Sequence, residues 1–482
     1  MNGNFFDLLR THWSVAPDRQ FLVPSVGPAV TYRWMDDRSA RFAAVLVAKN
    51  VSPGDRVVVQ IDKSVDAVAI YLGCLRVGAV YVPLNTSYTT SEVEYFLSDA
   101  DPALVVTRET VDELATAADR AEPRTTVETR LADDLAAMVY TSGTTGRSKG
   151  AMLTHANLAS NALTLHAIWR FTPGDVLLHI LPIYHVHGLF VALHTAILNA
   201  STVLFPDKFN VAEAKALMGE ATVMMGVPTH YIRLLDDPDF GPETCANMRL
   251  FTSGSAPMTE AVHNAFAERT GHLVLERYGM SECGMITSNP YDGDRIAGTV
   301  GYPLPAVQVR VVGEGGACEP GQVGVVQVVG PNVFAGYWRQ DDKTEEAFDD
   351  DWFITGDVGS LDGEGRLTLE GRSGDMIISG GLNIYPREIE MVLDECAGVV
   401  ESAVVGLPDP EFGERVVAFV VPDSDSADID AEDLLSQLRS QLASFKVPRI
   451  VQFIHELPRN SMGKVQKVAL RASDTDVVAH QE

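Results

Sequence analysis

The sequence predicts an α/β fold, with a large N-terminal region of stacked βα sheets, a small β element and a smaller α+β C-terminal domain. Three observations carry this prediction. Apolar runs alternate with amphipathic helical patterns between Arg56 and Tyr278, as in βαβ units with parallel strands. After Gly298, short strand patterns stand between glycine and proline turns. The length of 482 residues exceeds that of one ordinary domain.

In the N-terminal region, the apolar runs are nearly continuous, as expected of strands buried on both faces of a sheet. Strands are predicted at 56–61, 79–84, 135–140, 175–182, 201–206, 221–228, 249–257 and 272–279. Helices are predicted between them at 66–78, 154–169, 187–199, 229–237 and 259–271. The segment 108–134 is charged and poor in large apolar residues, so we expect a surface excursion there.

Two further units follow along the chain. Strands predicted at 307–312, 323–329 and 365–371 are separated by turn residues and form the small antiparallel element. From residue 376 onward, helix and strand patterns make a compact α+β unit of about a hundred residues, an ordinary domain size. We therefore expect an N-terminal domain at residues 1–373 and a C-terminal domain at residues 374–482.

The composition narrows the class of partners. A formal net charge of −28 opposes nucleic acid or an anionic membrane as the partner. No apolar run is long enough for a transmembrane helix, and the N-terminus lacks the features of a secretory signal. The five cysteines are scattered without a CxxC pair, which favours reduced thiols in a cytoplasmic protein and argues against structural zinc.

The stretch YTSGTTGRSKG, residues 140–150, lies between a predicted buried strand and a helix. Its glycines permit tight backbone turns, and its hydroxyls and lysine can donate to phosphate oxygens. The spacing differs from a Walker A loop. A flexible polar turn is the alternative interpretation. The candidate ATP contacts in this loop are Thr141, Ser142, Gly143, Thr144, Thr145, Gly146 and Lys149.

This loop, extended to YTSGTTGRSKGAMLTHANL, resembles the signature of the adenylate-forming superfamily, which contains acyl-CoA synthetases, adenylation domains and luciferases. Further matching stretches follow in order, namely LPIYHVHG, GSAP, YGMSE, GYPLP, VGVVQVVGPNVFAGYW, WFITGDVG, EGRSGDMIISGGLNIYPREIE and PRNSMGKVQK. The resemblance implies that a carboxylate attacks the α-phosphate of ATP to give an acyl-adenylate and pyrophosphate. A thiol then displaces AMP.

The resemblance also assigns the nucleotide contacts. It implies that Glu282 and Thr144 hold Mg²⁺, with Ser281 standing where the family usually has threonine. Asp357 and Arg372 would bind the ribose, and Tyr278 would stack on the base. The remaining expected ATP contacts are Gly254, Ser255, Ala256, Glu276, Gly279 and Met280. Each assignment has a structural alternative. Glu282 could be a solvated surface charge, and Tyr278 could serve core packing. Asp357 could be a turn residue, and Arg372 could form a surface ion pair.

The C-terminal motifs imply a mobile domain. Lys464, in the stretch PRNSMGK, resembles the catalytic lysine that neutralises charge during adenylation. Gly374 occupies the hinge position, where the family usually has lysine or aspartate, and glycine tolerates the backbone rotation of a hinge. In a second arrangement of the two domains, Ser379, Gly380 and Gly381 would line the tunnel for coenzyme A.

Arg277 is the most informative residue about the acid. Many relatives that take fatty or aromatic acids carry glycine here, whereas ERYGM resembles the branch of malonyl-CoA and methylmalonyl-CoA synthetases. A buried guanidinium without an anion is costly, and a second substrate carboxylate would satisfy it. A structural pair with Glu276 is the alternative, but neighbouring strand residues point to opposite faces.

Two histidines and a serine complete the predicted acyl site. His185 resembles the family's catalytic gating residue between ATP, the acyl group and pantetheine. His187 is a second imidazole nearby, for which an acyl contact and a satisfied core histidine remain equally open. Ser253 is the third expected acyl contact.

The sequence therefore predicts an ATP-dependent malonate–CoA ligase that uses Mg²⁺ and releases AMP and pyrophosphate. Alternatives are a methylmalonyl-CoA or broader short-chain acyl-CoA synthetase, a carrier-loading adenylation enzyme and a non-catalytic nucleotide-binding relative. We expect the carrier-loading enzyme less, because no carrier domain follows Glu482. We also expect the non-catalytic relative less, because Lys464, Glu282 and Asp357 are retained. The expected partners are malonate, ATP and coenzyme A, in a monomer or a homodimer.

Overall fold

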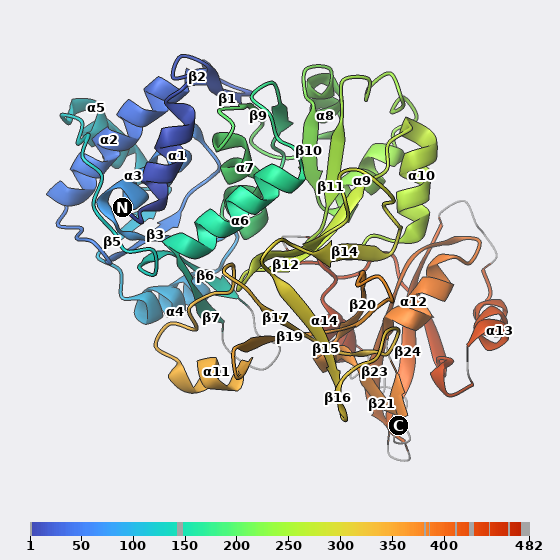
Figure 1. The fold of residues 1–482 in the computed structure, drawn as a ribbon. Helices are drawn as coiled ribbons and strands as arrows, with labels where there is room; N and C mark the ends of the chain where they lie inside the picture. The colour runs from blue at the N-terminus through green and yellow to red at the C-terminus, as the bar shows by residue number, and fades with distance from the viewer. Residues whose placement is uncertain are drawn as a thin grey trace.

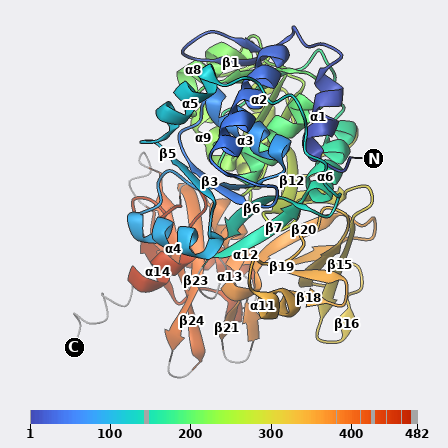
Figure 2. The ribbon, with the colours of Figure 1, turned by 90° about the vertical axis from the view of Figure 1, so that its left-hand side faces the viewer.

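The computed structural model describes residues 2–141, 148–379, 382–384, 386–409, 412–423, 429–442, 444–460 and 463–473. It has a mixed α/β architecture with a large N-terminal region and a smaller C-terminal domain (Figure 1). In the view turned by 90°, the C-terminal elements again lie against one end of the N-terminal region (Figure 2). The site described below lies along this junction.

The first sheet has the strand order β5-β3-β4-β6-β7. Its strands are β3 (Arg56–Gln60), β4 (Val80–Pro83), β5 (Leu104–Thr107), β6 (Leu135–Thr141) and β7 (Lys149–Thr154). The first four pair in parallel, and β7 pairs antiparallel with β6. The associated helices are α2 (Tyr32–Ala48), α3 (Val65–Val77), α4 (Thr90–Ala100) and α5 (Val111–Arg120).

The second sheet begins with parallel strands. They are β1 (Gln20–Pro24), β8 (Val176–Leu178), β9 (Thr202–Phe205), β10 (Val223–Gly226), β11 (Leu250–Ser253) and β12 (Leu275–Met280), with β2 (Val30–Thr31) antiparallel at the edge. The helices of this part are α1 (Phe5–Trp13), α6 (His155–Ile168), α7 (His194–Ile197), α8 (Val211–Met218), α9 (Pro228–Leu235) and α10 (Glu260–Thr270).

The small antiparallel element continues this second sheet through β13 and β14, so that the joined sheet has 15 strands. Its strands are β13 (Gly284–Ser288), β14 (Thr299–Pro303), β15 (Gln308–Gly313), β16 (Gly316–Ala317), β17 (Gly324–Val329), β18 (Phe348–Asp349), β19 (Trp352–Leu361) and β20 (Leu367–Arg372). The short helix α11 (Asp341–Glu346) precedes β18. This continuity brings β19 and β20 to the end of β12.

The C-terminal domain has its own sheet and apolar cores. Its strands are β21 (Ile377–Ser379), β22 (Leu382–Ile384), β23 (Val399–Asp409), β24 (Gly413–Pro422) and β25 (Ile450–Phe453). Its helices are α12 (Pro386–Asp394), α13 (Ala431–Gln441) and α14 (Lys467–Ser473). Both cores of this domain are built from residues after position 376, which makes it an independent packing unit.

Local chemistry explains where several helices begin and end. Helix α4 starts at a capping box in which Thr89 and Glu92 satisfy each other's backbone N–H groups. Helix α6 starts in the same way, with Thr154 and Asn157. Helix α3 ends at Gly78, whose φ of 72° suits a residue without a Cβ. These signals fix the ends of helices that their apolar faces alone leave open.

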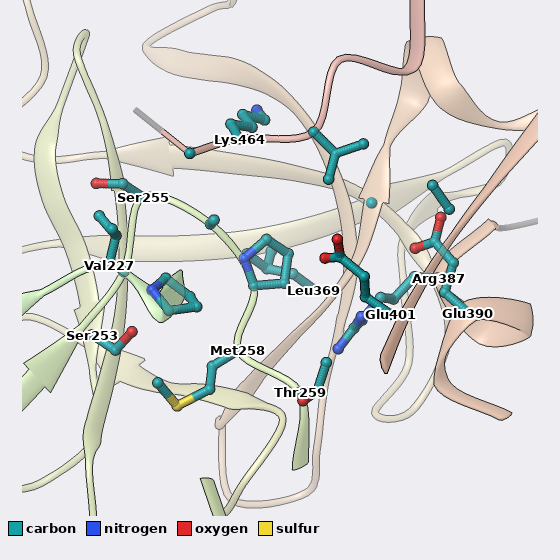
Figure 3. A pocket seen from close by; sticks show the side chains of 18 of the residues that line it. Val227, Ser253, Ser255, Met258, Thr259, Leu369, Arg387, Glu390, Glu401 and Lys464 are labelled. Carbon is teal, nitrogen blue, oxygen red and sulfur yellow. The ribbon is translucent and has the colours of Figure 1, made fainter. Parts of the chain in front are cut away.

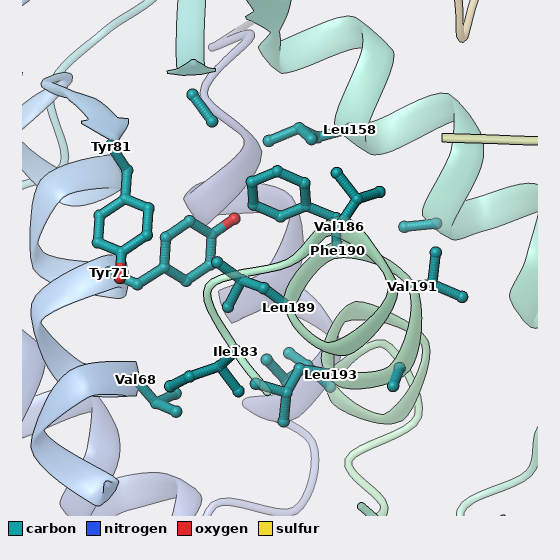
Figure 4. Close-up of a cluster of buried hydrophobic side chains, with 14 of the residues drawn as sticks. Val68, Tyr71, Tyr81, Leu158, Ile183, Val186, Leu189, Phe190, Val191 and Leu193 are labelled. Carbon is teal, nitrogen blue, oxygen red and sulfur yellow. The ribbon is translucent and has the colours of Figure 1, made fainter. Parts of the chain in front are cut away.

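Large side chains from three elements fill the core of the N-terminal region. Figure 4 shows Val68 of α3 beside Ile183, and Tyr71 of the same helix facing Leu189 and Phe190. The last two belong to a π-helix, His187–Leu193, that leads into α7. The Tyr71 hydroxyl reaches a ring nitrogen of the buried His194 at 2.7 Å, which satisfies one polar atom in this apolar setting.

The structure differs from the predictions in two places. Within 108–134, residues 111–120 form α5, which buries Leu114 and Ala118 against the core. The predicted helix at 187–199 begins as a π-helix, His187–Leu193. The chain packs closely there, since a Cβ on Gly188 would overlap the Pro182 carbonyl. No helix in the described part of the chain is both long and apolar enough to cross a bilayer.

Candidate active site

A cavity of about 310 Å³ lies between the N-terminal region and the C-terminal domain. Figure 3 shows Ser253 and Ser255 from the N-terminal region and Lys464 from the C-terminal domain around it. The cavity collects predicted site residues from distant parts of the sequence. They are Ser253, Gly254, Ser255, Ala256, Glu276, Arg277, Tyr278, Gly279, Asp357, Arg372 and Lys464.

One half of this cavity is a network of satisfied polar groups. The Tyr278 hydroxyl donates to Asp357 Oδ2 at 2.5 Å, and Arg372 Nε lies 3.0 Å from Asp357 Oδ1. The Asp357 carboxylate raises the pKa of Arg372. The pKa of Tyr278 is raised mainly by burial and, to a smaller extent, by the Asp357 charge. A carboxylate fixed in this way can accept hydrogen bonds from two neighbouring hydroxyls of a ribose.

The backbone beside this network is shaped by small residues. Ser255 has a φ of 70°, a left-handed conformation that is uncommon for a residue with a side chain. A Cβ on Gly279 would overlap the Gly284 carbonyl, because the β12–β13 pairing shifts register there. The following residues Met280 and Ser281 are half-buried at the end of β12 and in the turn after it.

Glu282 lies in that turn and is buried. Its Oε1 accepts hydrogen bonds from the Thr141 hydroxyl at 3.1 Å and from the Tyr337 hydroxyl at 3.2 Å. Burial raises the pKa of the carboxyl group, so a nearby cation would stabilise its ionised form. Carboxylate and hydroxyl oxygens are the ligands that Mg²⁺ prefers, so this donor set fits the expected metal.

Lys464 lines the same cavity from the opposite domain. Its backbone N–H donates to the Asn460 side chain at 3.0 Å, which fixes the turn that carries it. Surrounding protein atoms, and then the Arg372 cation, lower the pKa of the ammonium group, although the side chain as a whole remains exposed. The arrangement concentrates positive charge at the end of the ribose network, where a polyphosphate could be neutralised.

The other half of the cavity contains Arg277, of which only 2% is exposed. Its Nε and Nη2 have no hydrogen-bond partner among the described residues. Burial lowers the pKa of the guanidinium to about 10. Glu276, the alternative partner, instead accepts the Gly298 N–H at 3.3 Å, and burial raises its pKa to about 8.

Four further polar side chains belong to this half of the site. Ser255 Oγ lies 3.2 Å from His187 Nδ1, and His187 is 1% exposed. Within the described part of the chain, Ser253 Oγ, His185 Nδ1 and His187 Nε2 are buried without a partner. Burial, and then the Arg277 cation, lower the pKa of His185 to about 4, so this imidazole is neutral near pH 7. His187 is therefore half satisfied, through one nitrogen.

Some predicted residues lie elsewhere. Residues 142–146 of the loop, with the proposed metal contact Thr144, and the tunnel residues Gly380 and Gly381 are outside the described residues. Ser379 pairs with Leu382 and Gly413 in the C-terminal sheet. Gly374 lies in the 3₁₀ turn Ser373–Asp375, between β20 and β21. Lys149 begins β7, with its ammonium 4.1 Å from the Tyr337 ring.

Several residues at the site were not predicted from the sequence. Tyr337 contacts Glu282, and its only sequence signal was the family stretch FAGYW, to which no role was attached. Arg387, Glu390 and Glu401 line the C-terminal wall of the cavity (Figure 3). No local pattern marks these three, because only the packing of the two domains brings them to the cavity.

Comparisons with known proteins agree with this architecture. The family model of the AMP-binding enzyme matches residues 9–338, and that of the AMP-binding enzyme C-terminal domain matches residues 388–464. A feruloyl-CoA synthase from Amycolatopsis sp is 34% identical over 467 residues, which cover 92% of this chain and 94% of that protein.

Two crystal structures of MatB from Rhodopseudomonas palustris are also similar, and each match covers 99% of this chain and 100% of that chain. The ATP-bound structure is 48% identical, with a TM-score of 0.95. The apo structure is 47% identical, with a TM-score of 0.85. The higher score belongs to the ATP-bound form, in keeping with the position of Lys464 at the cavity.

Proposed function

The chain belongs to the AMP-binding enzyme family and is an AMP-forming acid–thiol ligase; we propose that its acid is malonate and that its product is malonyl-CoA. One malonate carboxylate oxygen attacks the α-phosphorus of ATP, and pyrophosphate leaves. The sulfur of coenzyme A then attacks the acyl carbon, and AMP leaves. The proposal includes a cytoplasmic enzyme that acts as a monomer or a homodimer.

The observation that carries this proposal is the buried guanidinium of Arg277, whose Nε and Nη2 find no partner among the residues that the structure describes. A buried cation without an anion is costly, and its burial already lowers its pKa. A dicarboxylate has one carboxylate for the phosphate and one for Arg277, to which it can bind through two parallel hydrogen bonds. Ser253 and His187, each with a buried atom that lacks a partner in the described chain, can complete this anion site.

Two further observations support malonate in particular. The chain resembles malonyl-CoA synthetases in its motifs, and the match to MatB extends over nearly the whole chain. The space beside Arg277 is also restricted, because a Cβ on Gly254 would already overlap the guanidinium. A short dicarboxylate suits such a site better than a long or aromatic acid.

The opposite half of the cavity suits ATP. Asp357 and Arg372 would hold the ribose, and Tyr278, Gly254, Ser255 and Ala256 would border the base. Mg²⁺, held by Glu282 and by the loop that contains Thr144, would supply positive charge to the phosphate oxygens. The rest of the loop and Lys149 would position the phosphates for in-line attack.

The two chemical steps would use two arrangements of the domains. Lys464 at the cavity, and the better match to an ATP-bound structure, support the present arrangement as the one for adenylation. Rotation near Gly374 would then bring Ser379, Gly380 and Gly381 to the pantetheine of coenzyme A. His185 would separate the acyl group from that channel as a neutral imidazole.

The proposal is tested first by substrate choice. Pyrophosphate release is measured with malonate, methylmalonate, succinate, acetate, butyrate and octanoate, with and without coenzyme A. We expect the highest kcat/KM for malonate. A preference for methylmalonate would move the proposal to the neighbouring enzyme, since one methyl group is worth only about 1–3 kcal/mol in a pocket. A preference for butyrate or octanoate would contradict the proposal.

The role of Arg277 is tested by the variants Arg277→Ala and Arg277→Lys. The alanine variant should lower kcat/KM for malonate by a factor that corresponds to roughly 3–5 kcal/mol of transition-state stabilisation. The kcat/KM of the lysine variant should lie between those of wild type and the alanine variant, because lysine keeps the charge but loses the planar fork. Activity with butyrate should hold steady or rise.

Arg249→Ala is the matched control, because this half-buried arginine is paired with Asp175 at 2.6 Å, away from the cavity. Any effect of the control should be parallel for the two acids. A parallel fall for both acids in Arg277→Ala would give Arg277 a structural role instead.

A further inference from the structure

Residues 334–338 run between two parts of the ATP site that are far apart in the sequence. The Trp338 N–H donates to the Gly150 carbonyl at 2.8 Å, one residue beyond the start of β7. The Phe334 N–H donates to the Glu282 carbonyl at 2.8 Å. The backbone of this segment is therefore tied at one end to the phosphate loop and at the other to the turn that carries Glu282.

Tyr337 projects from this segment and is 5% exposed. Its hydroxyl donates to Glu282 Oε1 at 3.2 Å. The Lys149 ammonium lies 4.1 Å from the centroid of its ring, and Phe334 packs against that ring edge to face, with centroids 4.8 Å apart. A single side chain thus contacts a carboxylate through its hydroxyl and a lysine through its ring.

We propose that Tyr337 is the positioning residue that sets the Glu282 carboxylate for the metal ion and the Lys149 ammonium for the phosphates of ATP. The inference rests on the proposed role of Glu282 toward Mg²⁺. The hydroxyls of Tyr337 and Thr141 both bind the same carboxylate oxygen. They therefore fix the rotation of the carboxylate group and engage one of its oxygens, so the other oxygen is the one that we assign to the metal ion.

The physical need for such a residue comes from the opposite charges of Glu282 and Lys149. Opposite charges attract strongly where little water is present. A phenol that holds each charge by a different part of the side chain keeps them at separate points, so both remain available to MgATP. Hydrogen bonds that orient a metal ligand typically change metal affinity by about 10–100-fold when they are removed.

The test measures equilibrium binding of ATP by calorimetry without any acid or coenzyme A, in saturating Mg²⁺ and in EDTA. The ratio of the two dissociation constants gives the gain in ATP affinity from Mg²⁺. Tyr337→Phe keeps the ring and removes the hydroxyl, so this gain should fall about tenfold, while ATP binding in EDTA should stay unchanged.

Tyr337→Leu should weaken ATP binding in EDTA as well, because Lys149 loses the ring beneath it. Adding Lys149→Met to Tyr337→Leu should then cost little more, whereas Lys149→Met alone should be costly. The ratio of the dissociation constants in Mg²⁺ and in EDTA is measured within one protein, so a general loss of folded material does not change it. A partly unstable variant therefore still shows how much Mg²⁺ adds to ATP affinity.

Tyr302→Phe is the matched control. This β14 residue has a carboxylate near its hydroxyl, with Glu364 Oε2 at 3.3 Å, and a cation near its ring, with the Arg366 guanidinium carbon 5.1 Å from the centroid. Arg366 also donates a hydrogen bond to the hydroxyl at 2.7 Å. This control should leave the Mg²⁺ gain at the wild-type value. Equal shifts of ATP affinity in Mg²⁺ and in EDTA for Tyr337→Phe, or no shift in either, would overturn the inference.

Glu282→Gln separates this inference from the proposed function. If Glu282→Gln removes the Mg²⁺ gain and Tyr337→Phe does not, the metal role stands and the role of Tyr337 is wrong. If Glu282→Gln leaves the gain intact, the metal role of Glu282 fails, and the inference about Tyr337 fails with it.

Discussion

The two halves of the interdomain cavity differ in how far their polar groups are satisfied by the protein itself. On the ATP half, Tyr278 and Arg372 are both bonded to Asp357. On the acyl half, Arg277 and Ser253 present buried polar atoms that have no partner in the described chain. The first half is organised before any ligand arrives, and the second is completed only by a ligand.

Under the proposed function, this difference would follow from the chemistry of ATP and malonate. A ribose is neutral and binds to fixed acceptors, so a rigid carboxylate network can be built in advance. A free malonate carboxylate carries a full charge, and only a counter-charge that is not already neutralised by the protein can bind it strongly. The unneutralised charge would lower the stability of the free enzyme and would raise its specificity for a dicarboxylate.

Beyond the Arg277 variants, the largest expected effect comes from Lys464, which approaches the ATP half from the other domain. Lys464→Ala should slow adenylation by about 10²–10³-fold, because its charge is needed while pyrophosphate leaves. Conversion of supplied malonyl-adenylate and coenzyme A to the thioester should change far less. Single-turnover rates of both half-reactions check this.

Lys343→Ala is the control for that measurement, since Lys343 forms only an exposed pair with Glu346. Equal slowing of both half-reactions in Lys464→Ala would mean that the lysine supports the domain junction and not the ATP half alone.

Gly254→Ala sharpens the comparison, because a Cβ at this position would overlap the Arg277 guanidinium. The displaced guanidinium should lower kcat/KM for malonate about a hundredfold, as expected when a binding group moves by about 1 Å. The value for butyrate should change little. The control is Gly241→Ala, where an added Cβ meets nothing within 4 Å. Parallel losses for the two acids would show that Gly254 serves the ATP half only.

The free energy of unfolding distinguishes the two halves directly. Arg277→Met removes a buried cation with two nitrogens that have no partner among the described residues, and it should stabilise the ligand-free protein by about 1–3 kcal/mol. Asp357→Asn breaks a satisfied network and should destabilise it by about 1–3 kcal/mol. Urea unfolding of the ligand-free proteins measures both changes. If both variants shift stability in the same direction, the contrast between the halves is wrong.

Glu276 is the exception on the ATP half, since it is buried and its pKa is raised to about 8. The folded state holds this proton more tightly than the unfolded state. Its contribution to stability is therefore fully present below the ordinary carboxyl range and is lost as pH rises to about 8.

Glu276→Gln lacks this titration, so its stability relative to wild type should rise by about 1 kcal/mol or more between pH 5 and pH 8. Urea unfolding of both proteins at several pH values measures the difference. A difference that stays constant with pH would show that Glu276 is ionised throughout, and that the ATP half is fully satisfied.

The sequence predicted most of the fold because apolar periodicity records which faces of an element are buried. The strand runs at 56–61, 79–84 and 135–140 appear as β3, β4 and β6. The sequence analysis made no prediction for residues 1–55, where α1 and α2 form, and it took the α5 region for a surface excursion. Helix α5 buries only two side chains, so its apolar signal is short.

By itself, the sequence determined the chemical types available to the site, because glycine, hydroxyl and charged residues stand at motif spacings along the chain. The tertiary structure decided which of them meet. The contact of Tyr337 with Glu282 spans 55 residues and depends on how the segment 334–338 pairs beside β7. Packing likewise decided that Arg277 Nε and Nη2 have no partner within the described part of the chain. Side-chain alternation on β12 separates Arg277 from Glu276 but cannot specify what faces it. Local pattern encodes burial and backbone conformation, whereas contacts between distant segments depend on strand register and domain packing, which no local pattern records.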